Sequence, residues 1–290
     1  MVVHIGIAGW SYDDWKGKVY ASGCKDTLAF CARYVQLLEV NSTFYRTPNP
    51  AVTARWIERT RALGTLFTAK LGQVFTHERR LSATDIDAFR AAMQPMSASG
   101  RLRALLAQFA HSFACDEGAR DHLTRVVATF TDVAPIAVEV RHGSWQTPSA
   151  LAFLRGLDVS LVHLDYPTRD TSFDLRLTGV HAHDLAYFRL HGRNAEAWGR
   201  KGAERDEVYD WVYSAAEVDD VALRLRAIAQ QAGTTLVVAN NHFEGKAMKL
   251  ALELVAKTSG AKVAVPDLLL ATYPDLATVA RRTGQGRLFG

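Results

Sequence analysis

Ionisable side chains follow short apolar runs at several places in this sequence, and their spacing suggests chemistry. In the stretch APIAVEVRHGSW, Glu139 interrupts the β-branched run 136–140, and Arg141 and His142 close it. Glu139 and Arg141 are two residues apart, so on a strand they point to the same side, and a carboxylate in an apolar setting needs such a cation nearby. A carboxylate, a guanidinium and an imidazole grouped in this way can bind an anion and transfer protons.

Other apolar runs end in the same way, and their polar residues complete a candidate site. We expect the chemistry to be carried by Glu139 as general base or acid, by His191 or His142 as the second proton carrier, and by Lys70. The residues expected to bind the substrate are Trp10, Glu39, Asn41, Tyr45, His77, Gln108, Arg141, Asp165, Arg189, Arg193, Asn240 and Asn241. The lysine and the arginines of this set would hold the charge of an anionic ligand.

The elements that must position these residues alternate between strand and helix. The expected strands are 5–8, 37–40, 66–70, 104–109, 136–140, 161–164, 187–190 and 236–239, and the expected helices include 52–63, 85–93, 119–130, 215–231 and 246–257. Such alternation gives a parallel sheet, and eight units in about 250 residues is the count of a closed (β/α)₈ barrel of the TIM type, with an open doubly wound sheet as the alternative. Because a parallel barrel brings the carboxyl ends of its strands to one face, the polar residues would converge there.

Two parts of the chain depart from this alternation of strand and helix. The segment 165–186 contains turn formers and no helical stripe, so the sixth crossover is expected to be irregular. The tail 259–290 should pack on the outside of the barrel, which makes residues 1–290 a single domain.

Composition limits the classes of protein that fit. Hydrophobic residues make up 48% and charged residues 22%, so the chain can bury a sizeable core. The net charge of +4 permits a nucleic acid or another anionic partner without requiring one. The three cysteines form no CxxC pair, which argues against a disulfide framework or a cysteine zinc site. Without a basic leader or an apolar stretch of about 18 residues, we expect no membrane segment and a cytoplasmic location.

Several interpretations of the polar residues stay open. Acids and bases gathered at the strand ends would also suit a structural ion-pair layer with no substrate. The histidines and carboxylates would suit a divalent metal ion, although Lys70, Arg141 and Arg189 would repel it. Two carboxylates facing one bond would suit glycoside hydrolysis, although the cationic residues fit a charged substrate better.

Two loops suit a phosphate group. The seventh strand leads into HGRNAEAWGRKG, which contains Arg193, Arg200 and Lys201, and the eighth leads into NNHFEGK at the start of a helix. Barrels often hold phosphate between these two loops, with backbone N–H groups at a helix N-terminus. Arg193 is the favoured ligand because it lies nearest to its strand, whereas the outer basic residues would also suit an exposed loop.

Several motifs resemble one family in the expected order. They are IGIAGWSYDDWKGKVY, LEVNSTFYRTP, FTAKLGQVFTHERRL, AVEVRHGSW, FRLHGR, VYDWVYSAAEV, VVANNHFEGKA and VPDLLLATYPDL. Together they resemble the domain-of-unknown-function 72 family, also called YecE-like, from Ile5 to about Leu276. The resemblance implies a (β/α)-barrel and carries no known activity, and it covers the site residues proposed above.

These observations lead to two hypotheses about function. The first is a hydrolase-like enzyme that acts on a phosphate-bearing or other anionic ligand, nucleotides and nucleic acid included, by acid–base or metal-assisted chemistry at the carboxyl face of the barrel. The second is a non-catalytic module that binds an anion or a nucleic acid in the same pocket. The sequence leaves the cofactor and the oligomeric state open.

Overall fold

A parallel sheet forms the centre of the molecule. The computed structural model describes residues 2–167 and 182–281. Within these residues the strands pair in parallel in one sheet, in the order β6-β5-β4-β3-β2-β1-β9-β8-β7. The strands are β1 (Val2–Ala8), β2 (Leu37–Val40), β3 (Leu66–Lys70), β4 (Leu102–Gln108), β5 (Ile136–Glu139), β6 (Ser160–Leu161), β7 (His163–Asp165), β8 (Leu185–Leu190) and β9 (Thr234–Ala239).

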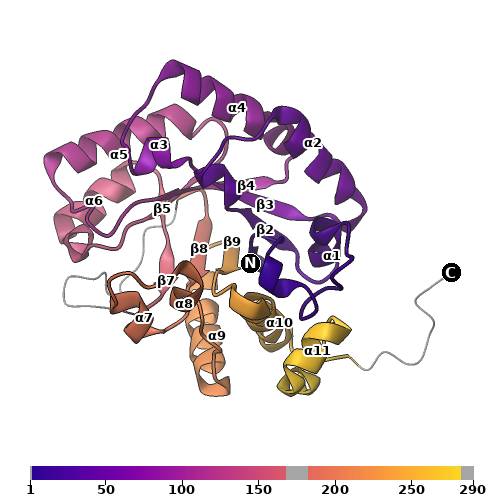
Figure 1. The fold of residues 1–290 in the computed structure, drawn as a ribbon. Coiled ribbons are helices and arrows are strands. Elements are labelled where there is room, and N and C mark those ends of the chain that lie inside the picture. The colour runs from indigo at the N-terminus through magenta and orange to yellow at the C-terminus, as the bar shows by residue number, and fades with distance from the viewer. Residues whose placement is uncertain (1, 168–181, 282–290) are drawn as a thin grey trace.

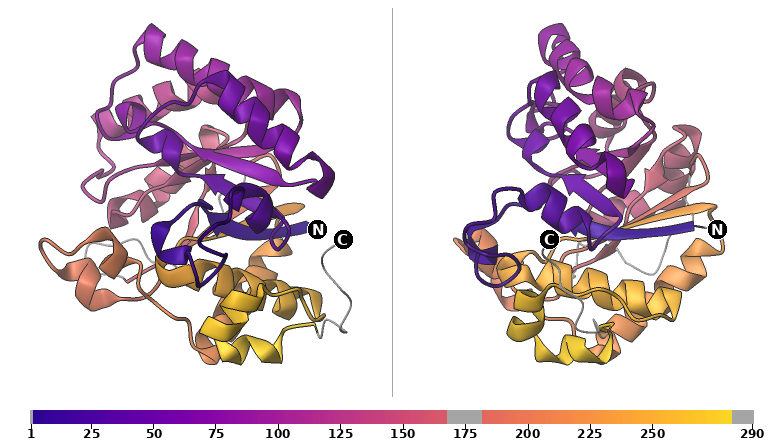
Figure 2. Two further views of the ribbon diagram at one scale, coloured as in Figure 1. Left: turned by 45° about the vertical axis from the view of Figure 1, so that its right-hand side comes forward. Right: turned by 90° about the vertical axis from the view of Figure 1, so that its right-hand side faces the viewer.

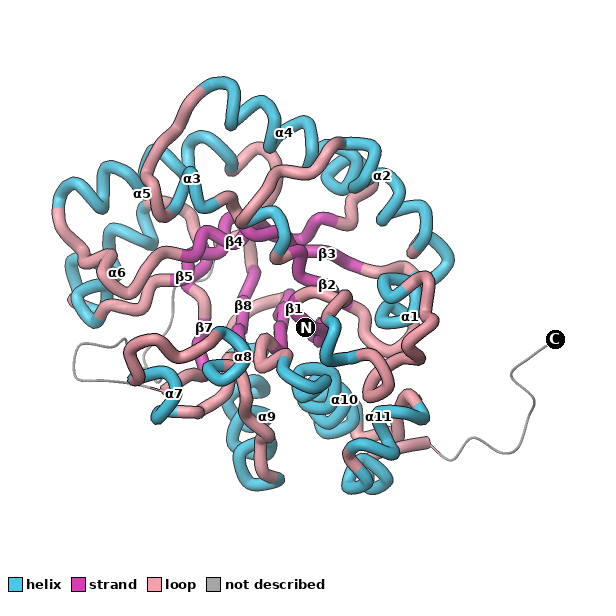
Figure 3. The backbone as a smooth tube through the Cα atoms, in the orientation of Figure 1, coloured by secondary structure: helices cyan, strands magenta, loops and turns pink. Residues whose placement is uncertain are grey.

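The sheet curls into a nearly closed barrel because its two end strands, β6 and β7, belong to one segment of chain. β6 pairs with β5 and β7 pairs with β8, and Val162 between them donates its N–H to the carbonyl of Val138 at 2.9 Å. The predicted sixth strand, 161–164, is therefore interrupted at Val162. Figures 1 and 3 show the strands at the centre with helices around them. The predicted α/β barrel is confirmed, and the open doubly wound sheet does not form.

Helices fill most of the connections between strands. They are α1 (Thr27–Ala32), α2 (Pro50–Arg59), α3 (Gln73–Thr76), α4 (Ala83–Ala98), α5 (Glu117–Phe130), α6 (Pro148–Gly156), α7 (Ala195–Gly199), α8 (Arg205–Val208), α9 (Ala215–Ala229), α10 (Lys246–Ser259) and α11 (Asp267–Thr272). Short 3₁₀ turns are η1 (Asp13–Trp15), η2 (Ser42–Phe44), η3 (Arg61–Leu63), η4 (Gly143–Gln146), η5 (Phe243–Gly245) and η6 (Pro274–Thr278).

Local sequence explains where several helices begin. Pro50 occupies the first turn of α2, behind an Asn49 side chain that accepts the N–H of Ala51. Ser82 accepts the N–H of Asp85 at 3.2 Å and so starts α4. α4 continues past the predicted end at residue 93 and through Pro95. Helix α1, which no apolar stripe had predicted, is short and begins at the cap Asp26.

Alternation along the strands creates two apolar layers. One lies between the sheet and the helices, and the other fills the inside of the barrel. The inner layer consists of Ala8, Leu37, Ala104, Leu106, Ala137, Val162, Leu164, Tyr166, Leu185, Tyr187, Leu236 and Val238. Since successive side chains on a strand point to opposite faces, the next inward position on each strand lies nearer the carboxyl face of the barrel.

The described part of the tail lies against α10, as Figure 2 shows. Leu269 and Leu276 are fully buried, and the Tyr273 hydroxyl donates to the carbonyl of Glu244 at 3.0 Å. Most of the sixth crossover (168–181) and the last residues of the tail (282–290) lie outside the described residues. Within residues 2–167 and 182–281, no helix has both the length and the apolar character needed to cross a bilayer.

Candidate functional site

Charged side chains occupy the inside of the barrel where the strands finish. On β2, Leu37 is followed two residues later by Glu39, and on β8, Tyr187 is followed by Arg189. Alternation places each pair on the same side of its strand, so the charged residue sits one layer above a buried neighbour. Glu39 and Arg189 are both buried, although they lie near the open end of the barrel. The apolar inner layer therefore lies beneath a charged layer at the carboxyl face. This charged layer consists of Glu39, Lys70, Glu139, Arg141 and Arg189.

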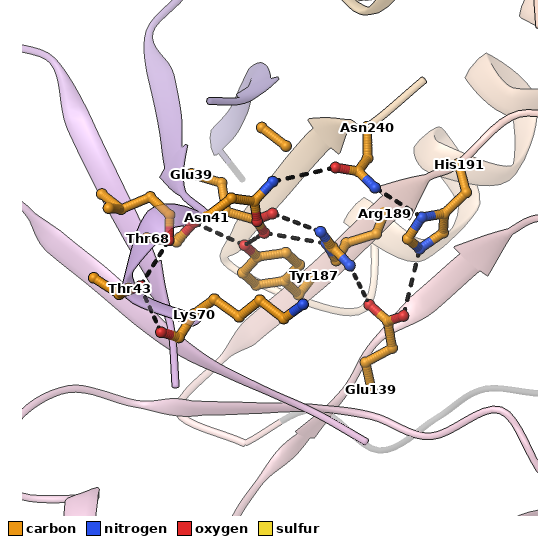
Figure 4. A network of polar contacts seen from close by, with 12 residues as sticks. Glu39, Asn41, Thr43, Thr68, Lys70, Glu139, Tyr187, Arg189, His191 and Asn240 are labelled. Atoms are coloured by element: carbon orange, nitrogen blue, oxygen red, sulfur yellow. Dashed lines mark hydrogen bonds and ion pairs between the residues drawn. The ribbon is translucent and has the colours of Figure 1, made fainter. Parts of the chain in front are cut away.

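Arg189 is the centre of this charged layer and is only 2% exposed. Its Nη2 and Nε donate to the two carboxylate oxygens of Glu39 at 2.6 and 3.1 Å, and its Nη1 donates to Glu139 at 2.6 Å (Figure 4). Arg141 donates two bonds to the other oxygen of Glu139, at 2.9 and 2.6 Å. These pairings offset the several kcal/mol that burying each charge costs.

The pairings also decide the protonation state of Glu139. Burial disfavours its charged form, but Arg189 and Arg141 outweigh burial and hold the pKa of the carboxyl well below its ordinary value. Burial likewise opposes the charge of Arg189, whereas Glu39 and Glu139 raise its pKa. Glu139 is thus an ionised carboxylate whose two oxygens both accept hydrogen bonds from arginine.

A chain of hydrogen bonds fixes the tautomer of His191. Asn41 donates from Nδ2 to Asn240 Oδ1 at 3.4 Å, and Asn240 donates from Nδ2 to His191 Nδ1 at 3.0 Å. The proton of the neutral ring then sits on Nε2, which lies 3.4 Å from Glu139 Oε1. Burial lowers the pKa of His191 to about 3, even though the carboxylate of Glu139 opposes this shift. His191 is therefore neutral at physiological pH.

Lys70 differs from the arginines because none of the described carboxylates lies within ion-pair distance of its ammonium. The Nζ atom lies 3.8 Å from the centre of the Phe44 ring, and the backbone carbonyl accepts the Thr43 hydroxyl at 2.6 Å. Figure 4 shows the side chain extended from its strand with no dashed line at its ammonium. Burial, and then Arg189, lower the pKa of Lys70 to about 7. Lys70 therefore gains and loses a proton near neutral pH.

A small pocket opens beside this lysine. It has a volume of about 50 Å³ and is called the Lys70 pocket below. Its lining consists of Asn41, Tyr45, Lys70, Gln108, Arg189, Tyr209 and Asn240. These residues come from loops and strands all around the barrel, as expected for the carboxyl face. Side chains predicted as site residues from five strand ends thus meet at one cavity.

A larger cleft adjoins the Lys70 pocket and shares Asn41 and Tyr45 with it. Its volume is about 390 Å³, and it is called the aromatic cleft below. Its lining consists of Gly9, Trp10, Ser11, Tyr12, Asn41, Ser42, Tyr45 and Trp56. The ring of Trp10 meets that of Trp56 edge to face, with centroids 5.2 Å apart. Trp10, predicted as a substrate-binding residue, therefore lies in the neighbouring cleft and not in the Lys70 pocket.

Asp165 and Arg193 form a separate cluster. Arg193 donates to both carboxylate oxygens of Asp165 at 2.8 and 2.7 Å, and its Nη2 also lies 2.9 Å from Asp220. Asp165 further accepts bonds from Arg224 at 2.7 Å and from the Tyr213 hydroxyl at 2.8 Å. Burial is outweighed by the two arginines, so the pKa of Asp165 is lowered. Neither predicted residue lines the Lys70 pocket, and the charges of both are already paired.

The loop suggested as a phosphate site has acidic partners of its own. Arg200 lies 2.6 Å from Glu207, and Lys246, at the start of α10, lies 2.7 Å from Asp210. Lys201 is exposed. The basic side chains of the two loops are thus largely compensated, in contrast to Lys70.

The remaining predicted residues lie around the mouth or behind it. His142 accepts the N–H of Ser144 at 3.2 Å and starts the turn η4. His77 is exposed, its Nδ1 lies 2.9 Å from the Thr76 hydroxyl, and its pKa is lowered by partial desolvation and by Lys70. Asn241 is buried and donates to the carbonyl of Trp211 at 2.9 Å, so it acts on the loop and does not line the pocket.

Two tyrosines of the site had not been predicted from sequence. Tyr187 bonds to Glu39 at 2.7 Å and to Thr68 at 2.8 Å, beneath the charged layer. Tyr187 lies two residues before Arg189 on the same strand, so the alternation of side chains could have predicted that both point into the barrel. Tyr209 lines the Lys70 pocket from the loop between α8 and α9. It lies in a motif quoted for the family resemblance, but no strand pattern points to it.

The donor atoms at the mouth do not suit a metal ion. Among the residues that the structure describes, no group of three or more His, Cys, Asp or Glu side chains is arranged to hold one. The carboxylates closest to the Lys70 pocket, Glu39 and Glu139, already accept bonds from arginines. Three cationic side chains surround them, which favours an anion over a cation.

Comparisons with known proteins give a consistent match. Residues 4–272 match the family described as "Protein of unknown function DUF72". The UPF0759 protein YunF of Bacillus subtilis is 23% identical over 258 residues, which cover 85% of this chain and 91% of that protein. A DUF72 family protein from Thermotoga maritima superposes with a TM-score of 0.79 at 28% identity, covering 89% of this chain and 100% of that one. One from Enterococcus faecalis gives 0.77 at 26% identity, covering 89% and 96%.

Proposed function

This chain belongs to the DUF72 family of proteins of unknown function, and we propose that it is an enzyme that binds a small anionic group, a phosphate or a carboxylate, in the Lys70 pocket. One observation carries the proposal. Lys70 points its ammonium toward a pocket at the carboxyl face of the barrel without a carboxylate partner among the described residues. When this lysine is protonated, its charge is best compensated by an anion from outside.

The charge balance of the layer supports an anionic ligand. Glu39 and Glu139 contribute two negative charges, whereas Arg141, Arg189 and protonated Lys70 contribute three positive charges. The surplus is one positive charge, held in a half-buried place where water screens it poorly. A ligand with one or two negative charges would compensate it.

Neutral polar groups around the pocket would orient such a ligand. The Gln108 side-chain amide donates one N–H to the carbonyl of Phe109 at 3.0 Å, which leaves its second N–H for another acceptor. The Tyr209 hydroxyl has no hydrogen-bond partner within the described part of the chain. Phosphate and carboxylate oxygens accept several such bonds, so donors of fixed geometry add specificity to charge.

Lys70 is the proposed group for proton transfer. Its pKa of about 7 suits general acid or base work at neutral pH. Glu139 was the expected base, but two arginines occupy its oxygens, and the pKa of His191 is far below neutrality. We therefore propose that Glu139 and His191 hold Arg189 in position. His142 would only cap its turn.

A binding module without turnover is the second candidate. The observation that favours it is that arginines compensate both carboxylates of the charged layer, Glu39 and Glu139, so Lys70 alone would have to perform the chemistry. The two candidates share the anion and differ only in what happens to the ligand after binding.

Two experiments test the proposal, first a measurement of anion binding and then a measurement of turnover. Inorganic phosphate should bind, and Lys70→Met should weaken its binding. The expected loss of affinity is about 10-fold or more, which corresponds to the free energy of one charge-assisted hydrogen bond. Lys257→Met is the matched control, because it removes the same charge from the last turn of α10, at the other end of the barrel. Phosphate monoesters and small carboxylic acids are then incubated with the protein and followed by NMR. Conversion that disappears in Lys70→Met supports an enzyme, unchanged bound ligand supports a binding module, and absence of anion binding refutes both.

A further inference from the structure

The aromatic cleft adjoins the Lys70 pocket, and its size suggests which part of a ligand it receives. The Lys70 pocket, at about 50 Å³, has room for a single small group, since one water molecule needs about 10–15 Å³ of volume measured in this way. Pockets for whole small molecules measure about 300–1,000 Å³. The aromatic cleft, at about 390 Å³, lies in that range. A ligand whose anionic group sits beside Lys70 must therefore extend outward, and the cleft that shares Asn41 and Tyr45 offers the space.

The walls of the cleft suit a flat ring. Tyr45 stands between the two cavities and is 64% exposed, which is unusual for an aromatic side chain in a protein with a large core. Trp10 and Trp56 add two indole rings to the lining of the cleft. Aromatic side chains at a binding site favour stacking with planar rings, because both surfaces leave water and their quadrupoles attract.

The rim of the cleft also offers polar groups. Ser11 and Ser42 are exposed, and their hydroxyls make no hydrogen bonds with other side chains of the described residues. Within the described residues, the Asn41 side chain makes one hydrogen bond, a long one of 3.4 Å to Asn240. A ring with hydrogen-bonding atoms on its edge would use these groups, whereas a plain hydrocarbon ring would not.

The wall of the cleft is held in place by backbone geometry. Gly9 has a φ of +73°, and a Cβ at that position would lie 2.4 Å from the Tyr12 hydroxyl oxygen. The Tyr12 hydroxyl donates to the carbonyl of Ala8 at 2.5 Å, and its ring stacks on that of His242 with centroids 4.6 Å apart. The turn that presents Trp10 and Ser11 is therefore preorganised, which lowers the entropy cost of binding.

We infer that the ligand is a nucleotide, with its phosphate beside Lys70 and its base in the aromatic cleft. The inference rests on the proposed function, because it needs an anion in the Lys70 pocket. It adds the second half of the molecule, a planar ring with polar edges, joined to the phosphate by a spacer that passes Tyr45 and Asn41.

Four probes separate the two halves of this ligand in calorimetric titrations. They are adenosine 5′-monophosphate, ribose 5-phosphate, inorganic phosphate and adenosine. The nucleotide should bind about 5- to 150-fold more tightly than ribose 5-phosphate, the range expected for stacking one base on aromatic side chains. Trp10→Ala should reduce nucleotide affinity to that of ribose 5-phosphate and leave phosphate binding unchanged. Tyr45→Ser should have the same effect. Because Tyr45 is exposed, a loss of affinity in this variant cannot be attributed to unfolding.

The outcomes distinguish this inference from the proposal beneath it. Equal affinities for the nucleotide and ribose 5-phosphate, with both weakened by Lys70→Met, would overturn the ring site and leave the anion pocket standing. Adenosine that binds as tightly as the nucleotide would overturn the assignment of both cavities to one ligand. If none of the three phosphates binds, the anion pocket fails as well, and the inference fails with it.

Discussion

The affinity for sulfate should fall steeply above pH 7, because Lys70 has to be protonated when an anion binds beside it. Sulfate is a suitable probe because it keeps its charge over this pH range. In the free protein, burial and Arg189 bring the pKa of Lys70 to about 7. A negative charge about 4 Å from the ammonium stabilises the charged form by about 4 kcal/mol at an effective dielectric constant of 20.

That interaction sets the size of the effect. Since one pKa unit corresponds to about 1.4 kcal/mol, the bound anion should raise the pKa of Lys70 by about 3 units, close to its ordinary value. Above pH 7 the free protein must then take up one proton on binding, so affinity should decrease about 10-fold per pH unit. Between pH 7 and pH 9 the expected loss is about 50-fold.

Calorimetry checks both the affinity and the proton. Titrations at pH 8 in buffers of different ionisation enthalpy should report uptake of nearly one proton per sulfate in the natural sequence and in Lys257→Met. Lys70→Met should bind weakly with no proton uptake. An affinity that stays level between pH 6 and pH 9, or proton uptake that persists in Lys70→Met, would show that another group titrates and that the reasoning about Lys70 is wrong.

Three further predictions concern stability and protonation. Because the pKa of Lys70 in the folded chain lies below its ordinary value of 10.5, its charged form opposes folding below about pH 7, and this penalty fades as pH rises toward 10.5. Thermal melts at pH 6 should therefore show a higher melting temperature for Lys70→Met, by about 2–4 °C for each kcal/mol of the penalty that is removed, and an unchanged or lower melting temperature would contradict this. Glu139→Gln should cost about 3–5 kcal/mol in urea unfolding at pH 7, since it leaves Arg189 and Arg141 short of a carboxylate, and a cost below about 1 kcal/mol would mean that the layer repacks. The contribution of Glu139 should be full above about pH 4.5, the ordinary pKa of its carboxyl, and should be lost as pH falls below that value toward the lowered pKa of the folded chain. The ring of His191 should not titrate between pH 5 and pH 8 by NMR, and a midpoint in that window would refute its neutral assignment.

Periodicity and strand ends were enough to derive the barrel and much of its mouth. Apolar runs that alternate with helical segments can only form a parallel sheet with crossovers, and this holds whatever the side chains at the ends do. The two-residue spacing of Glu139 and Arg141 predicted their ion pair, which forms with an N–O distance of 2.6 Å. Tyr187 could have been found by the same alternation, whereas Tyr209 could not, because it reaches the pocket from an irregular loop.

The tertiary structure decided which cation remains without a carboxylate. From sequence, Arg193 was the favoured phosphate ligand of its loop, and Lys70 was expected to bind charge together with Arg141 and Arg189. In the folded chain Arg193 finds Asp165 within 2.7 Å, while the described carboxylates lie beyond ion-pair reach of Lys70. The pairing of Arg189 with Glu39, 150 positions apart, depends in the same way on the stagger of the strands and the length of each side chain. The physical reason is that ion pairing and desolvation act over a few ångströms, so they are defined only after distant parts of the chain have been brought together.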